Sequence, residues 1–305
     1  MDVMTPGSGT AAGSSAMTPI CRIVVPLDGT SAAELALDTA RIFARVAHAP
    51  ITLVRGYSAT SYLPSGNAPM MGEWPLVTTS EVHEYLESVE RGLRNEGFAA
   101  ESYIAEWPGE VAIVRAAQEC GASLIVIASN LGAGGPHLPS PARVALEVLH
   151  HAECGVLVIP IGESGPLDHA EEQGIRLCPV VPPDMTQPDM RVLAIMADLL
   201  RLFGGAVRVM MLTSMESEEP DAGTASAVDA HLPAWLATGL SDAGIAPETV
   251  LASTAGSLRT CAACAHEQAD LMCIGVRKDE RHRMETVAAI ARMLRSTRQP
   301  LLFVP

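Results

Sequence analysis

Short apolar runs alternate along the first half of the chain with stretches whose apolar residues recur at helical spacing. The runs are Cys21 to Leu27, Ile51 to Arg55, Leu124 to Ala128 and Val156 to Ile159, and a further strand is expected at Ala99 to Ile104. Runs of this length between turn residues predict buried strands. Their alternation with helical patterns predicts a parallel sheet with helices on both faces, which is an α/β fold.

Capping and turn residues set the expected ends of the helices in this half. Thr30 or Ser31 is expected to cap the first helix, and Ser80 a charged helix that Gly97 stops. Pro108 is expected to start a third helix, which runs to Cys120. The helical pattern before the last strand runs from Ala142 to Ala152, and a long loop rich in Pro and Gly, Tyr57 to Thr79, follows the second strand.

The same order of elements begins again in the second half. The expected strands are Ile175 to Val181, Ala206 to Leu212, Thr249 to Ser253, Leu271 to Val276 and Leu301 to Val304. The expected helices are Pro188 to Phe203, Ala225 to Ala243, Leu258 to Gln268 and Met284 to Leu294. One alignment of the halves places Asp28 on Asp184, and a slightly smaller shift, after the shorter second loop, places Leu124 on Leu271. One fold unit is therefore predicted to occur twice.

Composition divides the rest of the chain. Residues 1–19 are rich in Gly, Ser, Thr and Ala, which predicts a disordered tail and no signal peptide. We expect a first domain at 20–161, a polar and acidic linker at 162–174 and a second, degenerate domain at 175–305. No apolar run reaches the roughly 18 residues of a membrane span.

The net charge argues against some classes of partner, and the cysteine content indicates the redox environment. The formal net charge is −15, which argues against nucleic acid and anionic membranes as partners, because both select basic surfaces. The seven cysteines are an odd number, and most of them lie in apolar runs. This pattern indicates reduced thiols packed as small hydrophobes and a cytoplasmic location.

Two stretches carry a family resemblance. A strand that ends in P-L-D-G-T at Pro26 to Thr30, and a last strand V-L-V-I-P after L-H-H-A-E-C, resemble the universal stress protein (UspA-like) family. The resemblance covers both halves and implies two tandem five-stranded parallel sheets of order 3-2-1-4-5, a Rossmann-like, adenine-nucleotide-hydrolase-like fold. It also implies that Val156–Ile159 and Leu301–Val304 pair antiparallel, either within the chain or in a homodimer.

The resemblance also implies a nucleotide site in the first half. Members that bind ATP carry Gly, two residues, Gly, nine residues, then Gly and Ser or Thr, after the fourth strand. Here Ala128 stands at the first glycine, Gly132 at the second with one residue inserted, and Ala142 and Arg143 at the Gly-Ser pair. The cofactor-binding positions implied by the resemblance are Pro26, Asp28, Val54, Ala128, Gly132, Ala142, Arg143 and Val144.

This site departs from the family pattern, so two functions stay open. Gly132 and its glycine neighbours still permit backbone approach to an anion, and Arg143 either contacts a phosphate or fills the pocket. The first hypothesis is a stress-response binding module that acts through protein contacts, with no confident cofactor. The alternative is an adenine-nucleotide sensor that binds ATP or AMP with Mg²⁺. No enzyme is expected, because the chain contains neither G-x-S-x-G nor a Walker A motif.

The second half departs further from the pattern. Gly275 matches the first glycine, but Lys278 stands at the second and Val287-Ala288 at the Gly-Ser pair. Asp184 remains, although an aspartate after a strand is as readily a helix cap. We expect this half to be a structural partner that has lost the site.

Some other side chains are of types found in metal or redox sites, but core packing or a helix end explains them as well. Cys261, Cys264, His266 and Cys273 suggest a metal or redox centre, but the alignment of Leu124 with Leu271 places the three cysteines on apolar positions of the first half. We therefore expect packing thiols. His150 and His151 are expected to end a helix, where cations suit the dipole.

Overall fold

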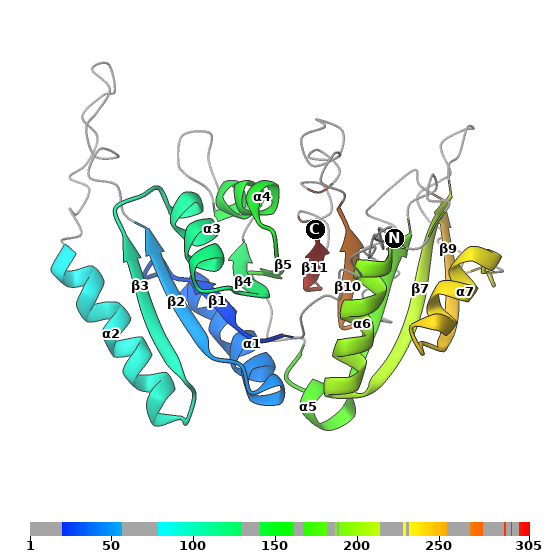
Figure 1. Ribbon diagram of the computed structural model, residues 1–305, viewed down its shortest axis with the longest axis horizontal. Coiled ribbons are helices and arrows are strands. Elements are labelled where there is room, and N and C mark those ends of the chain that lie inside the picture. Colours follow the sequence, from blue (N-terminus) through cyan, green and yellow to red (C-terminus); the bar gives the residue numbers. More distant parts are fainter. Residues whose placement is uncertain are drawn as a thin grey trace, which may run out of the picture.

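A computed structural model describes residues 20–56, 79–129, 141–161, 167–181, 187, 189–213, 228–229, 232–254, 269–276, 290, 294 and 299–305. The described strands form one 11-stranded sheet in the order β3-β2-β1-β4-β5-β11-β10-β6-β7-β9-β8. Figure 1 shows this sheet crossing the whole molecule, with β11 beside β5 in the middle. The mostly parallel α/β architecture expected from the sequence is confirmed.

The first half follows the predicted order of elements closely. It contains β1 Ile23–Pro26, α1 Ser31–Ala47, β2 Ile51–Gly56, α2 Thr79–Asn95, β3 Ala100–Ala105, α3 Gly109–Glu119, β4 Leu124–Ser129, α4 Pro141–His151 and β5 Gly155–Pro160. β1 lies between β2 and β4 and is parallel to both, so the order 3-2-1-4-5 is confirmed here. One cap differs from the prediction: α2 already begins at Thr79, and the Ser80 hydroxyl lies 3.2 Å from Glu84 Oε1 inside the first turn.

The second half repeats this arrangement on the other side of the sheet. It contains α5 Ala170–Gln173, β6 Ile175–Val181, α6 Met190–Phe203, β7 Gly205–Thr213, β8 Val228–Asp229, α7 Ala234–Asp242, β9 Pro247–Thr254, β10 Leu271–Gly275 and β11 Leu301–Val304. β6 lies between β7 and β10, as β1 lies between β2 and β4. Successive strands in the order β6, β7, β9, β10 and β11 therefore take the places of β1 to β5.

The helix expected from Ala225 to Ala243 is wrong in its first part. Val228 and Asp229 form a short strand that pairs antiparallel with β9, and α7 begins only at Ala234. Pro233 is the N-cap of α7. β8 takes hydrogen bonds that the outer edge of β9 would otherwise leave unpaired, which apolar spacing alone does not reveal.

The register of β6 also differs from the predicted alignment of the halves. Ile23 of β1 pairs with Ile51 of β2, whereas Leu177 of β6 pairs with Val207 of β7. If Ile51 is aligned with Val207, as predicted, the same alignment places Ile23 two positions beyond Leu177. By the register of the described strands, the predicted alignment of Asp28 with Asp184 is therefore off by two positions, and Asp184 itself lies outside the described residues.

The two halves are joined by an antiparallel pair of strands at the centre of the sheet. Leu301, Leu302 and Phe303 of β11 pair with Val158, Leu157 and Val156 of β5. Every other described neighbouring pair except β8 with β9 is parallel. The pairing implied for the last strands is thus present within one chain.

Two apolar cores lie on the two faces of the sheet, and both extend across the junction. One combines α1 and α2 with α6 and α7, and the other combines α3 and α4 with β10 and β11. At the junction the rings of Phe43 in α1 and Phe203 in α6 meet edge to face, with centroids 5.2 Å apart. The halves therefore share their cores and are not packed as two separate bodies.

Part of the segment expected to be a linker is packed against the fold. Leu167 and Ala170 are fully buried in the core that contains α1 and α6. Glu171 of α5 forms an ion pair with Arg45 of α1 at 2.6 Å. Two isolated apolar residues in a polar stretch were not enough to predict this anchor. The division of the chain at 161 and 175 remains a prediction.

A buried carboxylate connects the segment 167–173 to the sheet. Asp270, which precedes β10, is 3% exposed and accepts hydrogen bonds from the backbone N–H and the guanidinium of Arg176. Its Oδ2 lies 3.2 Å from Nε2 of His169. Burial would raise the pKa of Asp270, but the bonds from Arg176 and His169 outweigh burial and hold that pKa below its ordinary value of 3.8.

We expect Asp270→Asn to lower the free energy of unfolding at pH 7 by about 1.5–3 kcal/mol, the range for a hydrogen bond to a charged group. A carboxyl whose pKa is lowered on folding stabilises the fold above its unfolded-state pKa, and this stabilisation is lost as the pH falls through the folded-state value. The difference between the two proteins should therefore shrink below pH 3.8, as urea denaturation at pH 7 and pH 3 would measure.

A matched control is Asp38→Asn. The Asp38 side chain is 65% exposed and pairs with Arg41 at 3.1 Å, so its removal should cost less than about 0.5 kcal/mol. A difference between wild type and Asp270→Asn that does not change with pH would contradict the prediction.

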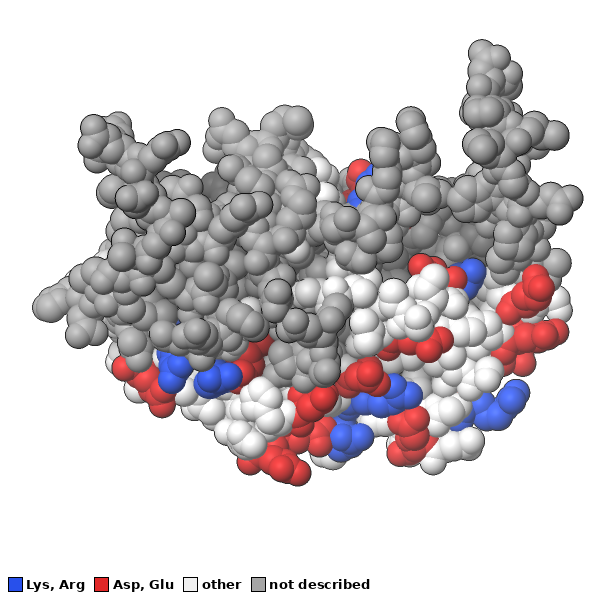
Figure 2. All heavy atoms as spheres, turned by 180° about the vertical axis from the view of Figure 1, so that it is seen from behind, with Lys and Arg blue, Asp and Glu red and all other residues white. Residues whose placement is uncertain are grey.

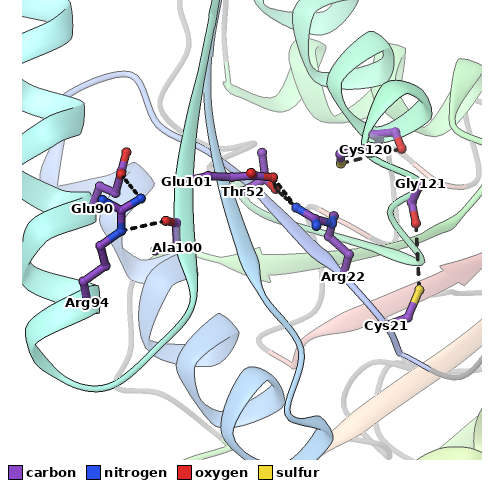
Figure 3. Close-up of polar contacts among 10 residues, drawn as sticks. Cys21, Arg22, Thr52, Glu90, Arg94, Ala100, Glu101, Cys120 and Gly121 are labelled. Carbon is purple, nitrogen blue, oxygen red and sulfur yellow. Dashed lines mark hydrogen bonds and ion pairs between the residues drawn. The ribbon is translucent and has the colours of Figure 1, made fainter.

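A polar network links the amino-terminal ends of the first three strands. Arg22 contacts Thr52 of β2 and Glu101 of β3, and the Thr52 hydroxyl donates to Glu101 at 2.9 Å (Figure 3). Cys21 and Cys120 lie beside it, and burial raises the pKa of the Cys120 thiol. The network satisfies polar groups on three neighbouring strands at this end of the sheet.

Several expectations concern residues outside the described part of the chain. These are the tail 1–19, the long loop after β2, Gly132, the cysteines Cys261 and Cys264 with His266, and the helices expected at 258–268 and, apart from Ile290 and Leu294, at 284–294. Cys273 is described and fully buried in β10. Burial raises the pKa of its thiol, which therefore stays protonated and packs as a small apolar group. α4 ends at His151, as expected.

Surface charge follows the composition. On the face drawn in Figure 2, the acidic and basic side chains of the described residues are interspersed and do not gather into one basic patch. No helix in the described ranges is both long and apolar enough to cross a membrane.

Candidate ligand site at the carboxyl ends of β1, β2 and β4

A cavity with about 620 Å³ of empty space, partly open to solvent, lies where β1, β2 and β4 end. It is lined by Pro26, Leu27, Asp28, Ala33, Val54, Arg55, Gly56, Gly109, Ile113, Ile127, Ala128 and Val144. The strand order reverses between β1 and β4, and ligands of open parallel sheets bind at this switch point.

The cavity brings together five of the eight residues predicted from the sequence. These are Pro26, Asp28, Val54, Ala128 and Val144. Gly132 lies outside the described residues, and Ala142 belongs to α4, although its side chain is not described. Arg143 also belongs to α4 and is exposed, but it does not line the cavity.

The turn from β1 to α1 positions the carboxylate of the site. Asp28 Oδ1 accepts hydrogen bonds from the backbone N–H of Thr30 at 2.9 Å and from its hydroxyl at 2.6 Å. The Thr30 hydroxyl in turn accepts from the N–H of Ala33 and caps α1, as predicted. Gly29 between them has φ +84°, which glycine adopts without steric cost. Among the described residues the turn engages only Oδ1, which leaves Oδ2 for a ligand donor.

The opposite wall depends on a close approach between β2 and the start of α3. A Cβ on Gly56 would lie 2.7 Å from the carbonyl oxygen of Trp107 and 2.9 Å from Cα of Gly109. Only glycine fits at this contact, which keeps α3 and Ile113 against the cavity. Sequence analysis missed Gly56 and Gly109, although a glycine that follows an apolar run is a signal for close backbone approach.

Arg55 is the second charged residue of the cavity, and the sequence analysis missed it as well. Its guanidinium lies over the turn at Gly29 and 6.0 Å from the ring centroid of Tyr85 in α2. The Tyr85 hydroxyl donates to Glu34 Oε1 at 2.8 Å. Burial and this bond raise the pKa of Tyr85 far above its ordinary value, so the hydroxyl keeps its proton. A polar residue directly after a buried run was the available signal.

The equivalent place in the second half is arranged differently. A Cβ on Gly275, at the end of β10, would lie 2.6 Å from Asp189 Oδ2 and 3.0 Å from Cγ2 of Val192. The Asp189 carboxylate caps α6 and pairs with Arg191 at 2.8 Å. It thus lies against the residue that matches Ala128. Lys278, Asp184 and Val287-Ala288 fall outside the described ranges.

The described lining combines an apolar floor with one carboxylate and one guanidinium. Such a lining suits a small ligand with a flat or apolar body and a few polar groups. It contains no Ser, Cys, His or Lys among the described residues, and so no nucleophile paired with a base. In the described ranges, no group of three or more His, Cys, Asp or Glu side chains is placed to hold a metal ion.

Fold and site together define the class: an open α/β sheet with a cavity at its topological switch point. Residues 20–160 match the model of the Universal stress protein family. The first half of the chain therefore belongs to this family.

Solved structures match both halves together. A universal stress protein from Archaeoglobus fulgidus DSM 4304 aligns with a TM-score of 0.65 and 15% identity over 94% of this chain and 96% of that chain. A protein of unknown function from Pseudomonas aeruginosa PAO1 aligns with a TM-score of 0.62 and 16% identity over 95% and 94%. At these identities the matches establish the fold alone. A comparison with curated proteins found none that matches the chain.

Proposed function

We propose that the chain is a regulatory binding module of the universal stress type, in which the first half holds a small ligand of the adenine-nucleotide class. The supporting observation is that Pro26, Asp28, Val54, Ala128 and Val144 line one cavity at the switch point of the sheet. The second half supplies the partner edge strand and shared cores, and we propose it as a second, degenerate copy of the same unit.

In this proposal Asp28 accepts a hydrogen bond from an amino or hydroxyl group of the ligand through Oδ2. Val54 and Ile113 contact the flat face of the ligand, because both line the apolar part of the cavity. The described lining offers no nucleophile with a base, so we propose binding without turnover. Action through contacts with other proteins, the first hypothesis from the sequence, remains a prediction.

The test is a thermal-shift series with ATP, ADP and AMP, each with Mg²⁺. A ligand at a hundred times its Kd stabilises the folded state by about 2.7 kcal/mol, which raises the melting temperature. We expect Asp28→Ala to abolish the shift, measured against the melting temperature of that variant without ligand. Asp184→Ala is the matched control and should leave the shift unchanged. If millimolar ligand produces no shift in the wild type, the proposal is wrong.

A further inference from the structure

Arg55 is the only cation among the described residues that line the cavity. It directly follows Val54 at the end of β2, on the same rim as Asp28. The only other charged residue in the described lining is Asp28, so the cavity carries one group of each sign. A ligand that fills it meets a guanidinium on the β2 side.

Two neighbouring elements lie against this guanidinium. A Cβ on Gly29 would lie 2.8 Å from Arg55 Nη1, so the side chain lies directly on the backbone of the β1–α1 turn. The Tyr85 ring supports it from α2, and Glu34 fixes the Tyr85 hydroxyl at 2.8 Å. A guanidinium positioned before binding loses less conformational freedom when a ligand arrives.

The fold does not require a cation at this position. Arg55 pairs with Ile104 in β3. Met211 takes the equivalent place in β7 and pairs with Ala252 in β9. The second half therefore builds the same strand position with an apolar side chain. This difference between the halves coincides with the described cavity, which only the first half contributes to.

The planar guanidinium is the protein group best suited to phosphates and carboxylates, because it donates two parallel hydrogen bonds. Arg143, the other cation near the site in sequence, is exposed and does not line the cavity. We infer that the cavity takes a small ligand whose anionic group, a phosphate or a carboxylate, is bound by Arg55 beside the β1–α1 turn. This inference rests on the proposed function and names where its ligand is recognised.

Isothermal titration with adenosine, AMP and adenosine 5′-carboxylate tests the inference. We expect both anions to bind the wild type more tightly than adenosine, and the tighter of the two identifies the anionic group. Arg55→Gln should weaken binding of that anion about tenfold to a hundredfold and change adenosine binding less than about threefold. Arg55→Lys keeps the charge without the planar guanidinium, so it should lose less affinity for the anion than Arg55→Gln does. Arg143→Gln is the matched control and should change neither affinity.

Three outcomes would overturn the inference. If Arg143→Gln weakens binding of the anion and Arg55→Gln does not, the anionic group binds at α4. The proposed function would then still hold. If adenosine binds as tightly as both anions, the cavity does not recognise an anionic group. The proposed function would then still hold, but the inference about Arg55 would be wrong. If none of the three ligands binds the wild type, both proposals are wrong. A melting temperature for each variant without ligand separates lost binding from lost folding.

Discussion

We expect Phe43→Ala to lower the free energy of unfolding by about 3–5 kcal/mol, the usual cost of truncating a buried aromatic side chain. Phe43 is 1% exposed and is one of the two largest fully buried side chains among the described residues. Its ring meets Phe203 across the junction of the halves, with the ring planes at 63°. Because both cores extend across this junction, urea denaturation should still give one transition for the whole chain.

A double-mutant cycle separates this junction from ordinary core packing. Phe43→Ala and Phe203→Ala should be coupled by about 0.5–1.5 kcal/mol, as aromatic pairs are. Leu86→Ala removes an equally buried side chain of α2, in the other part of the same core. It should add to Phe203→Ala without coupling. Two separate transitions, only one of which shifts in Phe43→Ala, would show that the halves unfold independently and would contradict the prediction.

Gly205→Ala should be the most destabilising substitution at a single described glycine, at about 4 kcal/mol or more. Gly205 begins β7 with φ +116°, and a Cβ there would lie 2.1 Å from the carbonyl oxygen of Ile175 and 2.5 Å from its nitrogen. These atoms belong to the backbone at the start of β6, so no side chain can move aside. β6 and β7 would have to separate at their first paired residues.

The neighbouring glycine provides the control. Gly204 has φ +69°, but a Cβ there would meet no atom within 4 Å. Gly204 has ψ −172°, so Gly204→Ala should cost only about 1–3 kcal/mol, which is the cost of this positive-φ backbone conformation alone. Chemical denaturation of the two variants measures the difference. Equal losses of stability would show that backbone conformation, and not the contact with Ile175, decides the effect.

The strands β4, β5, β10 and β11 could be predicted because they are buried over nearly their whole length, which makes each of them a continuous apolar run. Leu124 to Ala128 is an example, since all of β4 is buried. The start of α7 could not be predicted, because the two-residue strand β8 depends on the exposed edge of β9. The burial of Leu167 likewise depends on α1 and α6, which are distant in the sequence.

The site was predictable only where a local turn defines it. Asp28 and its neighbours follow from the P-L-D-G-T turn and from the resemblance it carries. Gly56 was missed because its contact, the backbone of Trp107, is set by where α3 docks. Arg55 was missed because the support from Tyr85 comes from a distant part of the sequence, through the placement of α2.

The antiparallel pair at the centre of the sheet has a consequence for biosynthesis. Val158 of β5 and its partner Leu301 of β11 lie in different halves of the chain, so β5 emerges from the ribosome long before β11. At about 5–20 residues per second this delay is roughly 7–30 s. During it, β5 presents an open edge, G-V-L-V-I-P, without a single charge to prevent pairing with another chain. The nascent first half therefore carries an apolar edge strand without its partner until the last strand is synthesised.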